Sequence, residues 1–317
     1  MVPARDGSRA LSHAKAVNTV VSAAWLIVLA SFLFATMGVC VKLASAEYAS
    51  GEIVFYRGVT GALMMWALSR FNGGSLRTHF ASMHFWRCLS GVTALSLWFY
   101  SIGNLPLATA MTLNYMSSVW MALFLIGGAV ALGSARVDGR LIFTVLLGFA
   151  GVALILRPTI AQQQLWYGLM GLLSGVISAT AYLQVTALGR VGEPEYCIVF
   201  YFSVGGICAG ALSVPLTGGL HAHSFRGASL LLAVGLLATV AQLLMTRAYS
   251  TGRTLVNASL QYLGIAFSFG YGVLLFGDHV TWPAVLGMAF IVGAGLSATL
   301  LRSRSSAPDT VNPALES

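Results

Sequence analysis

The stretch of the sequence from Leu105 to Ala131 runs for about 25 residues without a charged side chain. Pro106 lies near its start and suits the first turn of a helix, because the N–H that proline lacks has no helical partner there. An uncharged apolar helix of this length can cross the hydrocarbon core of a bilayer, which is about 30 Å thick. The stretch therefore predicts a transmembrane helix that contains one polar pair, Asn114 and Tyr115.

Ten apolar runs of this kind occur along the chain, and Gly, Asn, Pro or Ser marks nearly every joint between them. Only 8% of the residues are charged, whereas a soluble domain has about 25%. A transmembrane barrel would show alternating segments of about ten residues, roughly half the length of these runs. The sequence thus predicts an all-α integral membrane protein with ten transmembrane helices. The runs are residues 23–43, 52–68, 85–102, 106–132, 141–156, 166–188, 195–216, 227–249, 254–276 and 282–301.

The 17 Lys and Arg residues are spread along the chain, which indicates a membrane topology rather than a nucleic-acid partner. With the N-terminus in the cytoplasm, twelve of them fall on the inner side, Arg87 among them, and two on the outer side. Residues 1–22 are polar and basic and lack the apolar segment of a signal peptide. We therefore expect a multi-pass protein of the cell inner membrane whose two tails, residues 1–22 and 302–317, are both cytoplasmic.

The two halves of the chain resemble each other in order and spacing. Gln261 and Tyr262 lie 147 residues after Asn114 and Tyr115. Because each half has five runs, an odd number, the second half must insert with the opposite orientation. The sequence predicts two inverted five-helix repeats, an arrangement typical of secondary transporters with a substrate site near the midplane. The repeats are residues 23–156 and 166–301, and further matches are Ile-Val-Phe-Tyr at 53–56 and 198–201, Tyr-Ser at 100–101 and 249–250, and Leu-Gly at 147–148 and 286–287.

Three local motifs lie near the starts of runs or within them: Phe55-Tyr56-Arg57, Asn-Leu-Pro-Leu-Ala at 104–108, and Gly-Phe-Ala-Gly-Val at 148–152. In these motifs the chain resembles the drug/metabolite transporter superfamily, EamA-type, whose members have ten helices in two repeats. The resemblance covers roughly residues 23–301. It implies a transporter with a cavity lined by spans one to four and six to nine. The chain departs from the family at 133–136, where Gly-Ser-Ala-Arg replaces an acidic–basic pair.

Asn114 and Gln261 lie about eight and seven residues into their runs, which places both near the middle of the membrane. An amide in hydrocarbon must find hydrogen-bond partners, so both side chains should face the interior of the bundle. They are candidate substrate-binding residues together with Tyr115 and Tyr262. The alternative is a structural role in which the amides bond neighbouring helices.

Arg57 is the sharpest single candidate for substrate binding, because its counterpart in the second half is the apolar Phe202. A buried arginine can bind a carboxylate or phosphate through two parallel hydrogen bonds. The alternatives are that Arg57 reaches the membrane surface, or that it pairs with Glu52 or Glu47. Trp98 and Tyr100 add aromatic surface, either to the cavity or to an interfacial belt.

Glu52 and Glu195 open the second and seventh runs from opposite faces of the membrane. They are candidates for gating or proton coupling, whereas the alternative is a favourable charge at a helix N-terminus. No Asp or Glu is expected near the middle of the membrane, so the sequence shows no obvious proton relay. Exchange, facilitated diffusion and coupling through either glutamate all stay open.

Other functional classes lack their sequence signals. The chain has no phosphate-binding loop, no HExxH and no GxSxG, so neither ATP use nor intramembrane hydrolysis is indicated. The four cysteines form no CxxC pair, and we expect neither a metal site nor a cofactor. Small-residue motifs predict close helix packing within the bundle, with a homodimer as the alternative. These motifs are Gly171-x-x-x-Gly175, Gly206-x-x-x-Gly210, Gly148-x-x-Gly151 and Gly293-x-Gly295.

Taken as a whole, the sequence predicts a non-enzymatic secondary transporter of a small organic metabolite. Its expected partners are its substrate and the lipid bilayer, with a homodimer through small-residue helix faces as a further alternative. An amino acid or a related compound with an anionic and an apolar or aromatic part would suit Arg57 and the aromatic residues. The competing classes are a membrane-embedded enzyme and a non-transporting membrane scaffold.

Overall fold

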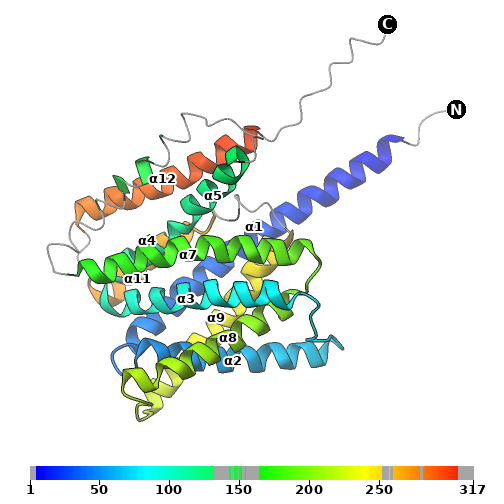
Figure 1. Cartoon of the computed structure of the whole chain (residues 1–317). Helices are drawn as coiled ribbons and strands as arrows, with labels where there is room; N and C mark the ends of the chain where they lie inside the picture. The colour runs from blue at the N-terminus through cyan, green and yellow to red at the C-terminus, as the bar shows by residue number, and fades with distance from the viewer. Residues whose placement is uncertain are drawn as a thin grey trace, which may run out of the picture.

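The computed structural model shows a bundle of α-helices (Figure 1). It describes residues 5–131, 164–251, 260–278 and 281–305, together with positions 143, 146–148, 150, 151, 154 and 257, and every regular element in these residues is helical. The helices are α1 (Arg5–Ala44), α2 (Ser50–Phe71), α3 (Ala81–Asn104), α4 (Leu107–Tyr115), α5 (Ser117–Ala131), α7 (Leu165–Arg190), α8 (Glu195–Ser213), the short 3₁₀ helix η1 (Pro215–Thr217), α9 (Phe225–Thr251), α11 (Leu263–Phe276) and α12 (Trp282–Ser305).

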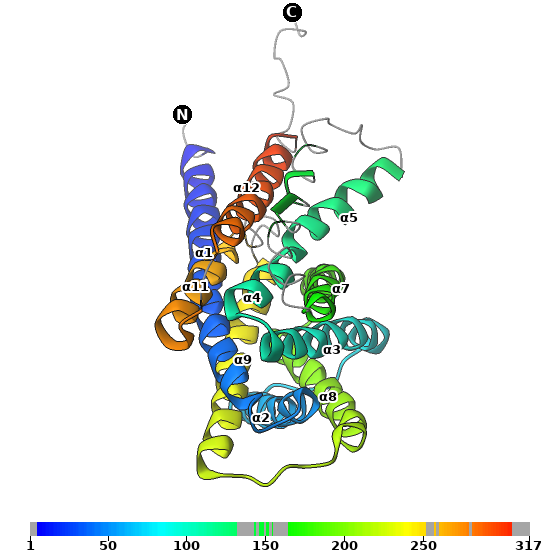
Figure 2. The same ribbon diagram turned by 90° about the vertical axis from the view of Figure 1, so that its left-hand side faces the viewer.

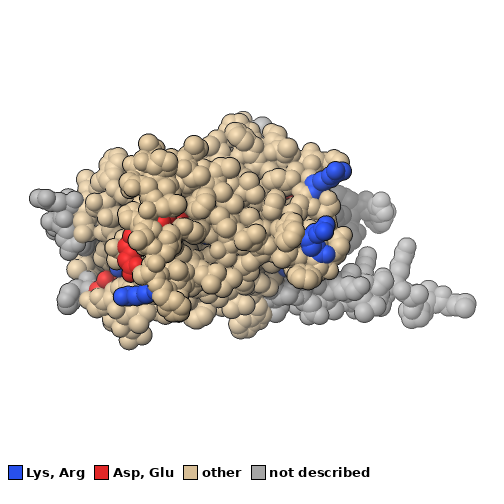
Figure 3. Space-filling model, turned by 90° about the horizontal axis from the view of Figure 1, so that it is seen from below, with Lys and Arg blue, Asp and Glu red and all other residues tan. Residues whose placement is uncertain are grey.

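Four of these helical segments are long and apolar enough to cross a bilayer: Ala23–Ala44 of α1, Leu165–Arg190, Glu195–Ser213 and Phe225–Ser250 of α9. The shorter segments Leu263–Phe276 and Trp282–Ala294 are also apolar. The face drawn in Figure 3 has charged side chains near its two ends and an uncharged band between them. This distribution suits a protein surrounded by lipid at its middle and by water at its ends.

Helices distant in sequence pair with one another across the bundle (Figures 1 and 2). The most extensive pairings join α1 with α9, α2 with α8 and α3 with α7, and α4 also lies against α11. Helices of the first half thus pack mainly against helices of the second half. The buried core therefore lies between the two halves of the chain.

Glycines let α2 and α8 approach until their backbones touch. A Cβ atom on Gly58 of α2 would lie 2.7 Å from the carbonyl oxygen of Ser203, and one on Gly210 of α8 would lie 2.7 Å from the backbone nitrogen of Phe55. Real Cβ atoms do not approach backbone this closely. Both positions therefore need glycine for the two helices to pack as they do.

We predict that Gly210→Ala lowers the thermal unfolding midpoint of the purified protein, because overpacking at such a contact costs about 1–3 kcal/mol. Gly270→Ala in α11 is the matched control, since nothing lies within 4 Å of the added methyl group. Alanine is the better helix former by about 1 kcal/mol, so the control should unfold at the same or a higher temperature. Equal midpoints for the two variants would show that α2 and α8 pack less closely.

The glycine motifs Gly171-x-x-x-Gly175 and Gly206-x-x-x-Gly210 face partners within the chain. A Cβ on Gly175 would meet the carbonyl oxygens of Leu113 at 2.7 Å and Asn114 at 3.0 Å, so α7 packs on the end of α4. The second motif packs against α2, as described above. A homodimer would therefore have to use another surface.

The predicted single helix over residues 106–132 is interrupted at Met116, between α4 and α5. Beyond Met116 the hydrogen-bond pattern tightens, because the N–H of Val119 bonds to the Met116 carbonyl, three residues earlier, at 2.9 Å. In the second half, α11 begins only at Leu263, directly after Gln261 and Tyr262. The same tight pattern occurs there, between the N–H of Gly264 and the Gln261 carbonyl at 2.9 Å. Both predicted polar pairs thus lie where a helix ends rather than inside a continuous one.

At its N-terminal end, α1 starts at Arg5, so the segment expected to be a tail continues the first helix. Most of the predicted fifth run, residues 141–156, lies outside the described residues, as do the sequence departure at 133–136 and the first residues of the predicted ninth run.

Candidate functional site

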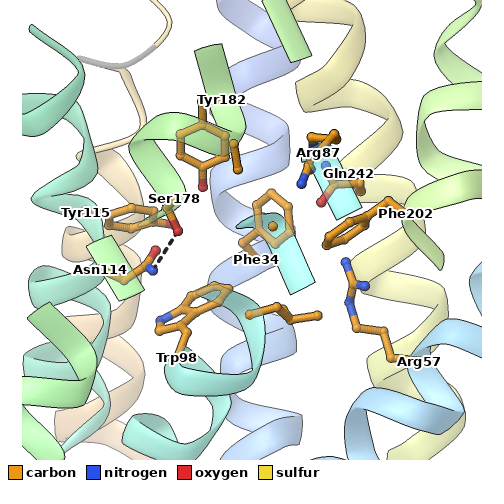
Figure 4. Close-up of a pocket in the computed structure, with 13 residues that line it drawn as sticks. Phe34, Arg57, Arg87, Trp98, Asn114, Tyr115, Ser178, Tyr182, Phe202 and Gln242 are labelled. Carbon is orange, nitrogen blue, oxygen red and sulfur yellow. Dashed lines mark hydrogen bonds between the residues drawn. The ribbon is translucent and has the colours of Figure 1, made fainter. Parts of the chain in front are cut away.

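A cavity with about 480 Å³ of atom-free space, its open mouth included, lies among α1, α2, α3, α4, α7, α8 and α9 (Figure 4). The space in it that the centre of a water molecule can occupy is about 40 Å³, which is below the roughly 300–1,000 Å³ of typical small-molecule pockets. Both halves of the chain contribute to it. The lining residues are Phe34, Arg57, Arg87, Gly91, Leu95, Trp98, Asn114, Tyr115, Ser178, Ala181, Tyr182, Phe202 and Gln242.

Four of the predicted substrate-binding residues line this cavity: Arg57, Trp98, Asn114 and Tyr115. The other three lie outside it, as the contacts of each show. The ring of Tyr100 packs on Tyr167 of α7 with centroids 5.4 Å apart. The Nε2 of Gln261 lies 3.4 Å from Sδ of Met245, and the buried Tyr262 precedes the first residue of α11.

Two buried arginines flank the ring of Phe202. The guanidinium carbon of Arg57 lies 5.0 Å from the ring centroid and that of Arg87 lies 4.3 Å from it. The two side chains are 3% and 2% exposed, so both cations are withdrawn from bulk water. The assignment of Arg87 to the inner membrane surface was therefore wrong. The residue that we contrasted with Arg57 by sequence, Phe202, is in fact its direct contact.

Arg87 reaches Phe202 because Gly91, one turn further along α3, has no side chain. A Cβ atom at Gly91 would collide with Nη1 of Arg87 and would lie 2.9 Å from the Phe202 ring. Arg87, Gly91, Leu95 and Trp98 all line the cavity and recur at spacings of four, four and three residues. This helical spacing from Trp98 is the signal in the sequence that could have found Arg87.

The two guanidinium groups have no carboxylate partner in the described part of the chain, where the ion pairs within 4.0 Å all join histidines and glutamates. The Nε atoms of both arginines and Nη1 of Arg87 also lack a hydrogen-bond acceptor. Contact with an aromatic ring stabilises a cation by about 0.5–2 kcal/mol, whereas taking an ion out of water costs several kcal/mol. The cavity is therefore strongly positive and would be stabilised by an anion.

Asn114 both lines the cavity and bonds α4 to α7. Its Nδ2 donates to Oγ of Ser174 at 2.9 Å and to Oγ of Ser178 at 3.3 Å (Figure 4). The structure thus combines the two alternatives for this residue, a structural amide and a polar cavity wall. Tyr182 closes the same side, stacked on Tyr249 with centroids 5.6 Å apart.

The carboxylate of Glu52, at the start of α2, is completely buried under the loop that precedes α9. Its Oε2 lies 2.8 Å from Nδ1 of His221, whose backbone N–H also donates to the carboxylate at 3.3 Å. Nε2 of His223 lies 3.8 Å from Oε1 of Glu52. A glutamate–histidine pair thus lies at the end of the bundle where α2 begins.

A second pair of this kind lies at the opposite end of the bundle, where α2 ends and α8 begins. Glu193 is 8% exposed, and its Oε1 lies 2.9 Å from Nε2 of His84, which is 3% exposed. Glu195, the predicted gating residue here, is half-buried in the first turn of α8, and no ion pair joins it to any described residue. In the described residues, no group of three His, Cys, Asp or Glu could hold a metal ion.

Lys42 and Asp278 join the start of α4 to α1 and to the end of α11. The Lys42 ammonium donates to the Leu105 carbonyl at 2.6 Å, and an Asp278 oxygen accepts the N–H of Leu107 at 3.2 Å. The lysine also lies 5.3 Å from the Phe276 ring centroid. These contacts anchor the two residues between α3 and α4, Leu105 and Pro106.

Helices that can cross a bilayer, packed around a cavity between the two halves of the chain, are typical of secondary transporters. The EamA-like transporter family matches residues 21–157 of the chain. The Pseudopaline exporter CntI of Pseudomonas aeruginosa is 33% identical over 271 residues, which cover 85% of this chain and 93% of that protein. The Riboflavin transporter of Rhizobium johnstonii is 26% identical over 288 residues, 88% of this chain and 91% of its own.

A crystal structure that is 18% identical superposes with a TM-score of 0.66 over 90% of this chain and 99% of its own, which shows a shared fold. The chain is a small-molecule transporter of the membrane, as predicted, and not an enzyme. It belongs to the EamA-like transporter family, within the drug/metabolite transporter superfamily that its sequence motifs resemble.

Proposed function

We propose that the protein is a secondary transporter that moves a small anionic metabolite, such as an amino acid or a related compound, across the cytoplasmic membrane. The observation that carries this proposal is Arg57, a buried cation that lines the cavity and pairs with no carboxylate among the described residues. Trp98, Tyr115 and Phe202 supply apolar surface for the rest of the substrate. The named substrates of two relatives, pseudopaline and riboflavin, are the first compounds to test.

Alternating access between two inverted repeats is the proposed mechanism. In the two repeats, α1 corresponds to α7 and α3 corresponds to α9. The pairing of α1 with α9 is therefore the repeat equivalent of the pairing of α7 with α3, and this symmetry supports the mechanism. The family match over residues 21–157 also agrees with a first repeat of residues 23–156. The excess of Lys and Arg in loops on one side supports two cytoplasmic termini.

The two glutamate–histidine pairs are the proposed gates. Glu52–His221 and Glu193–His84 lie at opposite ends of the bundle, and each joins the start of one helix to a loop or helix of the other half. In this mechanism one pair breaks while the other holds, so that the cavity opens to one side at a time. Glu193 thereby takes the role that the sequence predicted for Glu195.

Uptake into proteoliposomes tests the transport function, and cysteine labelling tests the substrate path. In a variant without the four native cysteines, we expect Asn114→Cys to react with a water-soluble maleimide and transported substrate to protect it. Gln261→Cys, outside the cavity, should react at least ten times more slowly. If Asn114→Cys is inert in every condition, water and substrate do not reach the cavity by this route.

A further inference from the structure

We propose that Arg57 and Arg87 bind two separate carboxylate groups of one substrate, so that the transporter selects dicarboxylic over monocarboxylic metabolites. This inference rests on the proposed transport function and specifies its substrate class. It assigns Arg87 as a second specificity-determining residue beside Arg57. Both residues line the cavity and are buried.

The position of Phe202 separates the two cations. In Figure 4 the guanidinium of Arg87 lies above the ring and that of Arg57 lies below it. Each guanidinium carbon is within about 5 Å of the ring centroid, so the two anion-binding points are close but divided by the ring. A single small anion would have to pass through the ring plane to contact both. Two carboxylates joined by a short carbon chain can instead reach around its edge.

Unused hydrogen-bonding capacity supports the same ligand. Nε of Arg57, Nε of Arg87 and Nη1 of Arg87 are buried without an acceptor in the described part of the chain. An arginine presents its donors in a planar fork that matches a carboxylate. The two forks therefore suit two carboxylates, whereas a substrate with one carboxylate would leave one cation buried and uncompensated.

The surroundings of Arg87 indicate a constructed site rather than a cation on its way to the surface. Gly91 leaves room for its guanidinium, and Phe202 supplies the ring beneath it. The uncharged polar side chain of Gln242 lies beside Arg87 (Figure 4). None of the described lining residues is acidic, so the counter-charges for the two arginines would have to come from the substrate.

The test is equilibrium binding to the purified full-length protein in lipid nanodiscs, measured by calorimetry and by thermal stabilisation at millimolar ligand. The probes are the unbranched dicarboxylates from malonate to adipate, the monomethyl ester of each, and inorganic phosphate. We expect one chain length to bind at least tenfold more tightly than its own monoester and than phosphate. A monoester or phosphate that binds as tightly as the best diacid would overturn the proposal, and so would the absence of any diacid binding.

Substitutions test whether each of the two arginines binds one carboxylate of the diacid. Arg57→Gln and Arg87→Gln should each weaken diacid binding at least tenfold, to the level of the monoester, while monoester binding changes less than threefold because one arginine remains. Gly91→Ala should resemble Arg87→Gln, since it displaces Arg87 without removing its charge. Arg70→Gln, an exposed position on α2, is the charge-matched control and should bind like the unmodified protein. Unchanged diacid binding in Arg87→Gln would refute the assignment.

The outcome separates this inference from the proposed function. Diacid-selective binding without uptake into proteoliposomes would refute transport and keep the two-carboxylate site. If the protein takes up a monocarboxylate as well as the dicarboxylate of the same chain length, the transport function is supported and the two-carboxylate site is refuted.

Discussion

Arg57→Gln is expected to reduce the initial rate of substrate uptake into proteoliposomes by about two orders of magnitude while the protein still folds. Losing a desolvated arginine–carboxylate contact costs about 2–5 kcal/mol, and each 1.4 kcal/mol corresponds to about a tenfold change in affinity. None of the described lining residues is acidic, so no protein carboxylate can compensate and the loss falls on substrate binding. Folding should survive, because Arg57 makes no ion pair with any described residue.

Two comparison variants make this result specific. Arg57→Lys keeps the charge but loses the planar fork, so its uptake should fall between that of the unmodified protein and that of Arg57→Gln. Arg70→Gln removes an exposed charge from the same helix and should transport normally. If Arg57→Gln takes up substrate at the unmodified rate, Arg57 serves only as a structural contact of Phe202.

His84→Ala is expected to open the end of the bundle where α8 begins. The substitution leaves the buried Glu193 carboxylate without its partner. A hydrogen bond to a charged group contributes about 1.5–3 kcal/mol, which shifts the equilibrium between closed and open forms by roughly 10- to 100-fold. The natural reporter is Cys197, which is fully buried at this end and whose thiol donates to the Ser75 carbonyl at 3.3 Å.

The measurement is the rate at which a maleimide labels Cys197 in nanodiscs, with Cys40, Cys88 and Cys208 replaced by serine. His84→Ala should raise this rate at least tenfold. His221→Ala, which breaks the pair at the opposite end, should leave the rate unchanged or lower it. Equal labelling in both variants would mean that the Glu193–His84 pair does not hold this end closed.

The sequence predicted the helices closely wherever a loop has clear end signals. The predicted run 52–68 corresponds to the observed helix Ser50–Phe71, and the predicted run 166–188 corresponds to Leu165–Arg190. Apolar length and scarce charge suffice for this, because a membrane span must satisfy its backbone within one helix. The sequence also singled out Arg57, since a cation inside an apolar run must have a partner or a function; the structure places it on the cavity wall, and its role in substrate binding stays a prediction.

Three features could not be predicted, because they depend on contacts between distant residues. The interruption at Met116 has no proline or glycine to mark it. Arg87 lies near a span end, where charge counting assigns it to the surface. Its helical spacing from Trp98 indicates the face of α3 on which it lies, but its contact with Phe202, far away in the sequence, could not be predicted. Glu193 rather than Glu195 meets a histidine because the chain turns at Gly192, whose φ is 81°.

The backbone contact between α2 and α8 has a consequence for motion. Helices that touch through glycines such as Gly58 and Gly210 cannot slide along each other without collision, so we expect this pair to act as a fixed axis. Arg57 and Phe202 lie on that axis, whereas Arg87 lies on α3. When the surrounding helices rotate, one half of the anion site would then stay in place and the other half would move. The distance between the two guanidinium groups would then differ between the inward-open and the outward-open states of the transporter.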